Sequence, residues 1–374
     1  MTAPENKNRP AHMARPSKPL PYAAPSQDVE RADRRWSGPR IALSVMAVAL
    51  ALLLGAVALF AHSLNSSISL EEDDRSAVEV LERPQEEKNA ATYALIVGTD
   101  SRDDDFGGRS DVLILARIDA DSRTVSLVSI PRDTMVNYSS GVQKINAIYA
   151  YQGARGIVEC VSEFAGVPIS HFVRVNFTGL VELVDRLGGV EVDVPETVTA
   201  GEFTIYEGPQ TLSGSEALAY ARERYTASGG DFGRSQAQRL IVAALVEKVL
   251  ATPPQELPAV VSDLASCVST DYSVPDLVGL ALKLQSGQLT VHSAAVPSYT
   301  FWQDDVSYVG TMYEEWQAMM RRMDAGLDPA DTSAAVPEPQ ASDEKLGAAT
   351  NAASPRDYQE LAAEGMTTDD VAGV

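Results

Sequence analysis

The stretch that decides the fold spans residues 95–133 and reads LIVGTDSRDDDFGGRSDVLILARIDADSRTVSLVSIPRD. Three short runs in and beside it, residues 93–97, 112–118 and 124–130, are rich in Val, Ile and Leu and are bounded by Gly, Asp, Ser or Pro. Such runs are typical of β-strands. The links between them are short and polar, so we expect neighbouring antiparallel strands.

Charged side chains gather at one edge of this predicted sheet. The end of the first strand, the start of the second and the end of the third meet there. Two carboxylates near two guanidinium groups, on a glycine-rich loop, suit a divalent cation and phosphate oxygens. Taken singly, such residues are usually solvated surface residues, so the convergence on one edge is what favours a site. The residues concerned are Asp100, Arg109, Asp111, Arg132 and Asp133.

The composition narrows the function classes. The chain has 374 residues and a net charge of −22, which argues against a general nucleic-acid binder. The two cysteines, Cys160 and Cys267, fit no zinc or redox spacing, and both a disulfide and a pair of buried thiols remain open. The histidines lack metal-ligand spacing, and no Ser-His-Asp or Cys-His pair is indicated.

The first part of the chain predicts a membrane anchor. Residues 1–40, rich in Pro, Ala, Arg and Ser, predict a disordered cytoplasmic tail. Residues 41–62 hold a run of 21 uncharged residues, 41–61, which spans roughly 31 Å as a helix and predicts a transmembrane signal anchor. Basic residues precede the run and acidic ones follow it, so we expect a single pass with the N-terminus cytoplasmic and the rest extracytoplasmic. A signal peptide cleaved near residues 56–58 is the alternative, and the long region before the run argues against it. Residues 63–91 predict an acidic stalk.

Residues 92–323 alternate between helix-like and strand-like patterns and predict one domain with helices packed on a sheet. Residues 324–374 are rich in Ala, Pro, Asp and Glu and predict a disordered acidic tail. Expected helices are residues 142–152, 154–164, 178–187 with Thr178 as a cap, 234–250, 257–267, 274–284 and 308–323, and expected strands are residues 171–176, 190–194 and 289–296.

A second informative stretch begins at Ser213. Ser213 followed by Glu216 predicts a capping box that opens a short helix. This helix leads to Arg222 and Arg224, whose guanidinium groups face one side if the backbone there is extended.

A long helix is expected after the sequence GGDFG at residues 229–233, with Asp231 as a plausible cap. Arg234 and Gln238 lie four residues apart and share a face of this helix. The helix N-terminus itself favours phosphate. A helix that begins with polar residues and continues with apolar ones suits a ligand with an anionic head group and a hydrophobic tail.

The ordered motifs GTDSR, GRSD, SIPRD, QKINAIYAYQGA, VNFTGLVELVDRLGGVEVDVP, LSGSEALAYARERY and GGDFGRSQAQR resemble the LytR–CpsA–Psr family. The match covers roughly residues 92–323. It implies a single extracytoplasmic α-β-α sandwich with a central mixed sheet and a hydrophobic pocket for a polyprenyl chain. It also implies a phosphotransferase, with pyrophosphatase side activity. The glycopolymer, such as teichoic acid or arabinogalactan, moves from an undecaprenyl or decaprenyl pyrophosphate carrier to a wall acceptor, commonly peptidoglycan.

The resemblance assigns roles residue by residue. Asp100 and Asp111 match the family's metal-binding aspartates, with magnesium as the usual metal and manganese as the alternative. The family's pyrophosphate-binding arginines match Arg109, Arg132, Arg222 and Arg224, and its pyrophosphate-contacting Gln matches Gln238. The residues expected in catalysis are Arg109, Arg132, Asp231 and Arg234.

Two details of the expected site stay open. The family often has Arg just before its Gln, where this chain has Ala237, and Arg239 is a candidate to compensate. The acceptor hydroxyl needs a base, for which Asp231 is the first candidate and Asp133 the second, although either could instead orient an arginine.

Three function classes compete. The phosphotransferase is favoured. A non-catalytic polyprenyl-phosphate-binding protein or regulator of cell-envelope assembly is the alternative, and a degenerate site would point to it. A transcriptional regulator is disfavoured by the predicted membrane span, the acidic charge and the lack of a helix-turn-helix pattern.

Overall fold

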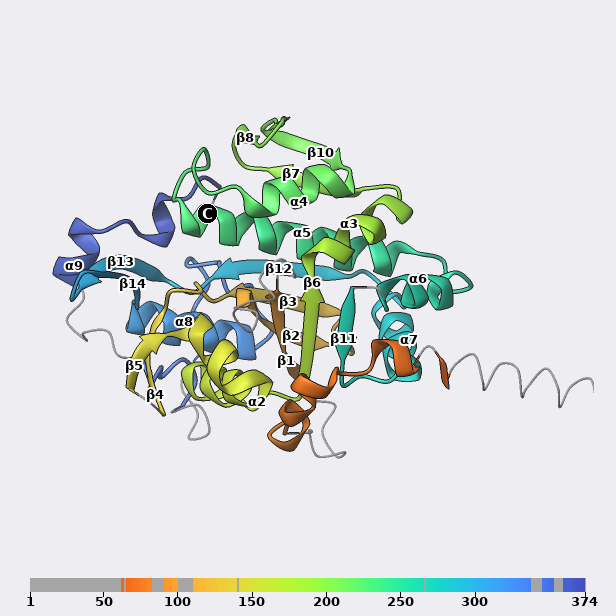
Figure 1. Cartoon of the computed structure of the whole chain (residues 1–374), viewed down its shortest axis with the longest axis horizontal. Coiled ribbons are helices and arrows are strands. Elements are labelled where there is room, and N and C mark those ends of the chain that lie inside the picture. The colour runs from red at the N-terminus through yellow and green to blue at the C-terminus, as the bar shows by residue number, and fades with distance from the viewer. Residues whose placement is uncertain are drawn as a thin grey trace, which may run out of the picture. The chain divides into compact units, whose positions relative to one another are not determined.

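A six-stranded mixed sheet lies at the centre of the fold (Figure 1). Its strand order is β11–β6–β1–β2–β3–β12. β1 pairs antiparallel with β2, and β2 with β3, which confirms the predicted topology of residues 93–130. β6 and β12 join in parallel on the two sides, and β11 closes one edge antiparallel to β6. The strands are β1 Thr92–Thr99, β2 Ser110–Asp119, β3 Thr124–Ser129, β6 His171–Asn176, β11 Val268–Thr270 and β12 Thr290–Ala295.

The computed structural model describes residues 62–63, 65–82, 91–99, 110–139, 141–265, 267–337, 345–352 and 359–373. All of these fall in the unit that begins at Ala56. The predicted cytoplasmic tail and all of the predicted membrane span except His62 lie outside the described residues. Among the described residues, no helix is both long and apolar enough to cross a membrane.

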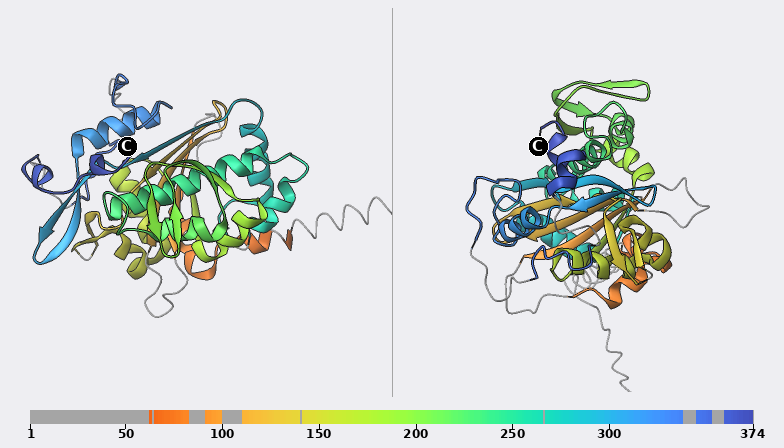
Figure 2. Two further views of the ribbon diagram at one scale, coloured as in Figure 1. Left: turned by 90° about the horizontal axis from the view of Figure 1, so that it is seen from above. Right: turned by 90° about the vertical axis from the view of Figure 1, so that its left-hand side faces the viewer.

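Helices cover both faces of the sheet, because side chains along its strands point alternately to two cores. Leu95 and Leu115 belong to the core under α2 (Ile145–Ala165) and α8 (Tyr313–Asp324). Ala94 and Ile114 belong to the opposite core, under α3 (Phe177–Arg186), α4 (Gly214–Arg222) and α5 (Asp231–Ala251). Figure 1 and the right-hand view of Figure 2 show these two groups on opposite faces. The predicted α/β class with a central mixed sheet is confirmed.

The smaller elements complete the two layers. α6 and α7 match the predicted helices 257–267 and 274–284, although α6 ends earlier. The short pairs β4–β5, β7–β10, β8–β9 and β13–β14 are antiparallel. Their bounds are β4 Met135–Tyr138, β5 Gly141–Lys144, β7 Val190–Val194, β8 Val198–Ala200, β9 Phe203–Ile205, β10 Gly208–Leu212, β13 Ser298–Gln303, β14 Val306–Thr311, α6 Leu257–Leu264, α7 Val274–Leu284, α9 Gln359–Glu364, and the 3-10 helices η1 Glu72–Glu79 and η3 Thr368–Asp370.

Several predicted helix starts are wrong. The first predicted helix, 142–152, begins only at Ile145, because residues 142–144 pair with β4 as strand β5. The predicted boundary between helices 142–152 and 154–164 is confirmed, because Gly153 has a non-helical backbone conformation (φ 66°, ψ −164°) that kinks α2 between two helical stretches. α8 begins at Tyr313 rather than at residue 308, because Tyr308 lies in β14. α3 begins at Phe177, so Thr178 lies inside the helix and is not its cap.

The folded domain is larger than residues 92–323. In the predicted stalk, Ile68 is 1% exposed and packs against Val261 and Val274. Asp74 is 1% exposed as well, and it accepts a hydrogen bond from the Tyr149 hydroxyl at 2.8 Å. The prediction of a solvated stalk is therefore wrong for residues 65–82, since buried apolar side chains and a buried carboxylate fix them to the domain.

The predicted disordered tail also packs against the domain in part. Leu346 and Ala349 are buried in the core around α2, and Val371 is buried near the start of α5. Both cysteines are buried free thiols, which resolves the alternative that the sequence left open. Burial raises the pKa of the Cys160 thiol to about 12.

The end of α2 gives a test of how tightly residues 345–349 pack. Gly166 follows α2 with a φ of +70°, and a Cβ there would lie 1.6 Å from the Lys345 carbonyl oxygen. Gly188 follows α3 with a φ of +78° and nothing within 4 Å of a Cβ. Gly188→Ala should cost only the left-handed backbone strain, about 1–2 kcal/mol. Gly166→Ala should lower the free energy of unfolding in urea by about 1–3 kcal/mol more than Gly188→Ala does, because its new Cβ would also overlap the Lys345 carbonyl group. Equal losses would show that residues 345–349 do not pack there.

Candidate functional site

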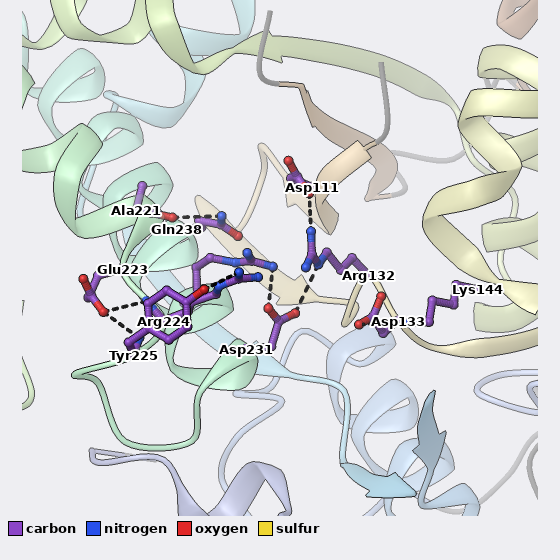
Figure 3. Close-up of polar contacts among 11 residues, drawn as sticks. Asp111, Arg132, Asp133, Lys144, Ala221, Glu223, Arg224, Tyr225, Asp231 and Gln238 are labelled. Atoms are coloured by element: carbon purple, nitrogen blue, oxygen red, sulfur yellow. Dashed lines mark hydrogen bonds and ion pairs between the residues drawn. The ribbon is translucent and has the colours of Figure 1, made fainter. Parts of the chain in front are cut away.

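Arg132 lies at the centre of a charged cluster where β3 ends. Its Nη1 donates a hydrogen bond to Asp111 Oδ1 at 2.6 Å, and its Nε lies 3.3 Å from Asp231 Oδ2. Asp111 stands near the start of β2, and Asp231 is the first residue of α5. The antiparallel pairing of β2 with β3 brings Asp111 to Arg132, as the sequence predicted (Figure 3).

Asp231 holds a second guanidinium group beside the first. Arg234 Nη2 lies 2.6 Å from Asp231 Oδ1, so the two oxygens of one carboxylate each contact a different arginine. Asp231 was expected as the helix cap, but Gly230 occupies that position and Asp231 lies inside the first turn. An acidic residue there complements the helix dipole.

Several N–H donors of these arginines have no acceptor among the described residues. Arg132 Nε and both Nε and Nη2 of Arg234 are buried, and among the described residues none of them has a hydrogen-bond partner. The contacts to Asp231 are close enough for ion pairing but are not aligned as hydrogen bonds. Because buried donors without acceptors are costly, this arrangement suits an anionic ligand that supplies oxygens.

Burial and charge act differently on the two arginines. Burial lowers the pKa of Arg132, but Asp231 and Asp111 outweigh it and raise the pKa above its ordinary value. For Arg234 burial prevails and lowers the pKa, against the raising effect of Asp231. Arg132 and Arg224 add to this lowering because they are like charges.

A folded turn carries Arg224. Glu223 Oε1 accepts hydrogen bonds from the backbone N–H groups of Arg224, Tyr225 and Thr226, at 2.6–2.9 Å. Burial raises the pKa of Glu223, but these three donors more than offset it and lower the pKa. The Arg224 guanidinium lies 4.7 Å from the Tyr225 ring centroid and donates to the Tyr225 hydroxyl. Arg222 ends α4, and Glu223 has the extended backbone on which the predicted common direction of the Arg222 and Arg224 side chains depends.

The remaining predicted residues of α5 have structural partners. Gln238 is 5% exposed, and its Nε2 donates to the Ala221 carbonyl at 3.0 Å, which ties α5 to the end of α4. Ala237 is buried in the core. Arg239 donates to Ser129 Oγ and Ser293 Oγ at 2.6 and 2.7 Å, and burial lowers its pKa to about 10. Arg239 therefore braces the end of β3 and joins no ion pair of the Arg132 cluster.

Sequence reasoning missed three residues beside the site, which are Glu223, Lys144 and Tyr308. Glu223 shapes the Arg224 turn, and Lys144 Nζ lies 3.2 Å from Asp133 Oδ2. Lys144 also lies 5.9 Å from the centroid of the Tyr308 ring. No local pattern marks these residues, because each acts through a contact that folding creates.

Asp111 is the member of the predicted metal-binding pair that lies among the described residues. Asp111 is 34% exposed, and only its Oδ1 has a partner among the described residues. One or two carboxylates suit magnesium, which keeps most of its coordination for water and phosphate oxygens. Asp100 and Arg109 lie outside the described residues. Within the part of the chain that the structure describes, no group of three or more His, Cys, Asp or Glu side chains could hold a metal.

Replacing Asp231 tests how the two arginines are held together. Asp231→Asn keeps the shape but removes the charge between two guanidinium groups, so we expect the free energy of unfolding in urea to fall by about 1–3 kcal/mol. Asp193→Asn, at an exposed position of β7, is the matched control and should change it by less than about 0.5 kcal/mol. Identical midpoints for both variants would show that Asp231 does not stabilise the cluster.

Similarity to solved structures supports the fold. Bacillus subtilis TagV is 28% identical, with a TM-score of 0.53 over 60% of this chain and 92% of that one. The structure described as "TagT bound to LIIa-WTA" is 25% identical, with a TM-score of 0.55 over 70% and 99% of the two chains.

Curated relatives include "Polyisoprenyl-teichoic acid--peptidoglycan teichoic acid transferase TagU" of Enterococcus faecalis, 36% identical over 57% of this chain and 72% of the relative. "Cell wall biosynthesis protein LcpA" of Corynebacterium glutamicum is 30% identical over 56% and 51% of the two chains. The chain spans about half the length of several other curated relatives. The model of the LytR_cpsA_psr family matches residues 56–325. The chain therefore belongs to the LytR_cpsA_psr family.

Proposed function

We propose that this protein is a phosphotransferase that moves a glycopolymer from a polyprenyl pyrophosphate carrier to a hydroxyl of the cell wall, commonly on peptidoglycan. The observation that carries the proposal is the set of buried N–H donors on Arg132 and Arg234 that have no acceptor among the described residues. A pyrophosphate supplies oxygens for these donors, and its negative charge matches the guanidinium groups.

The charge of the cluster supports an anionic donor. Arg132 and Arg234 lie together, and Arg224 is close enough to lower the pKa of Arg234 as a like charge, so three guanidinium groups gather at the site. Phosphoryl transfer depends mainly on positioning and on neutralising charge, and guanidinium groups held in fixed positions supply both. The N-terminus of α5 adds a further preference for phosphate.

The bond changes in the proposed reaction are simple. The acceptor hydroxyl oxygen forms a new bond to the phosphorus that bears the glycopolymer. The bond between that phosphorus and the bridging oxygen of the pyrophosphate breaks, and polyprenyl monophosphate leaves. The hydroxyl proton passes to a base or to water. Water in place of the hydroxyl gives the pyrophosphatase side reaction.

The geometry favours different roles for the two candidate bases. Both oxygens of Asp231 already contact guanidinium groups, so we assign it the task of orienting Arg132 and Arg234. Among the described residues, the only ion pair of the Asp133 carboxylate is the one between its Oδ2 and Lys144. We therefore propose Asp133 as the base and Asp231 as a positioning residue.

Magnesium, or manganese in its place, is proposed at Asp111 together with Asp100. The metal, when bound, neutralises the charge that develops on the phosphate oxygens. Asp111 keeps Oδ2 without a partner among the described residues, which fits this task. Asp111 also holds Arg132, so the same carboxylate places one guanidinium group beside the proposed metal.

The relatives and the sequence support the choice of substrates and location. The names of the Enterococcus relative and of the TagT structure refer to teichoic acid on a polyisoprenyl carrier and to wall teichoic acid. We propose a glycopolymer of this class, with arabinogalactan as the alternative. We also propose that residues 41–62 anchor the protein in the membrane with the domain outside the cell, which keeps the site near a lipid-linked donor.

Transfer by the purified full-length chain in lipid vesicles tests the proposal. With magnesium and a polyprenyl pyrophosphate-linked glycan, the chain should transfer the glycan to peptidoglycan and release polyprenyl phosphate. Arg132→Ala and Asp111→Ala should each lower kcat by about 10²–10³-fold, the loss expected when one preorganised charge contact is removed. Chelation of the metal should have an effect of the same size.

Arg155→Ala is the matched control. Arg155 is half exposed, and its ion pairs among the described residues are surface contacts with Glu79 and Glu159, so its loss should leave the rate unchanged. Tight donor binding without turnover in the wild type would instead support the non-catalytic binding protein. Unchanged rates in Arg132→Ala and Asp111→Ala would refute the proposed site.

A further inference from the structure

A small apolar cluster joins three parts of the chain beside the site. Phe232, Val309 and Val371 are 5–6% exposed and form a cluster separate from the two main cores. Phe232 lies in α5, Val309 in β14, and Val371 in residues 366–373, which we call the strap. Figure 1 shows the strap in dark blue, passing from the β13–β14 hairpin to the start of α5.

Two members of the cluster are directly connected to the two halves of the site, which are the start of α5 with Asp231 and the turn after β3 with Arg132. Phe232 is the neighbour of Asp231 in the first turn of α5. The Val309 N–H donates to the Asp133 carbonyl at 3.0 Å, and Val309 also forms a β-bridge with Thr134. Val309 is thereby fixed to the turn that carries Arg132. Val371 belongs to the same cluster, so the strap, the hairpin and the start of α5 share one small apolar core beside the site.

Hydrogen bonds hold the strap at both ends. At the hairpin, the Thr300 N–H donates to the Met366 carbonyl at 2.8 Å, and the Ser298 N–H donates to Thr368 Oγ1 at 3.2 Å. At α5, Gln236 Nε2 donates to the Ala372 carbonyl at 2.9 Å. The Ala372 N–H donates to Ser228 Oγ at 3.0 Å.

The backbone before α5 packs closely on Val371. A Cβ at Gly229 would lie 2.5 Å from Val371 Cγ2, so there is no room for a side chain between them. Gly229 has a φ of +72° and leads through Gly230 into Asp231. The path of the chain into α5, and with it the position of Asp231, is therefore set against the strap.

We propose that the strap, through Val371, is a positioning element that keeps the Arg132 turn and the start of α5 at the spacing that the donor pyrophosphate requires. The strap lies outside residues 56–325, which the family model matches. The proposal rests on the proposed phosphotransfer at the same site. Val371 touches no reacting group and acts only by holding residues that do.

Truncation with rescue by a peptide is the central test. The full chain ended after Gly365 should stay folded, because both main cores are intact, but its kcat for glycan transfer should fall by about 10–100-fold, the size expected for a small misplacement of reacting groups. A peptide of residues 365–374 should restore the rate in a saturable manner, and the same peptide with Val371→Asp should not.

Point variants separate positioning from stability. Val371→Asp should lower kcat at temperatures well below the Tm of the variant, whereas Val371→Ile should retain it. Val306→Asp is the matched control, because it makes the same change on the hairpin that the strap contacts, at a position that is 40% exposed, and it should leave kcat unchanged. Folding of each variant is checked by near-ultraviolet circular dichroism.

Each outcome decides the proposal. If the truncated chain is folded and its kcat is unchanged, the strap only stabilises the fold, and the inference is overturned. If its kcat is raised, the strap inhibits the reaction, and the inference is overturned as well. If the wild type shows no transfer, the proposed function fails, and the same variants are compared in the Kd for a polyprenyl pyrophosphate. A Kd unchanged by truncation would then overturn the strap's role as well.

Discussion

One carboxylate between two guanidinium groups is the interaction on which the site depends. Like charges on Arg132 and Arg234 repel, and both side chains are largely buried, so they stay together only because Asp231 lies between them. Asp111 fixes Arg132 from the other side. Because the contacts to Asp231 are close but not aligned as hydrogen bonds, the donors keep their capacity for a ligand. The protein thus holds two guanidinium groups in fixed positions and keeps several of their N–H donors available for a ligand.

The central sheet and α5 together bring the charged residues of this cluster to one place. Antiparallel pairing of β2 with β3 places Asp111 beside Arg132, and α5 crosses the same end of the sheet with Asp231 and Arg234 in its first turn. The Glu223 turn and the strap act on the backbone rather than on a ligand, and both shape the chain just before α5. Rigid elements carry the charges, and loops set the angles between these elements.

Sequence reasoning predicted the centre of the fold well and its margins poorly. Continuous apolar runs identify β1, β2 and β3, and their short links fix the pairing, which is why the approach of Asp111 to Arg132 could be predicted. The strap could not be predicted from its sequence, MTTDDVAG. Its two larger apolar residues are Met366, which is exposed, and Val371, which is buried, and this pattern resembles that of a disordered tail. Glu223 and Lys144 carry no local signal, and the role of Asp231 as a clamp depends on two side chains that approach only in the folded chain.

The central claim is that these arginines hold a pyrophosphate while one of its bonds is exchanged for a bond to a wall hydroxyl. Phosphorus-31 NMR of a reaction containing the full-length chain, magnesium, a polyprenyl pyrophosphate-linked glycan and peptidoglycan measures this directly. We expect the two pyrophosphate resonances to disappear together, while one phosphomonoester resonance from polyprenyl phosphate and one phosphodiester resonance from the glycan–acceptor bond rise in equal amounts. Pyrophosphate resonances that persist unchanged, or a phosphomonoester that rises without a phosphodiester, would contradict it.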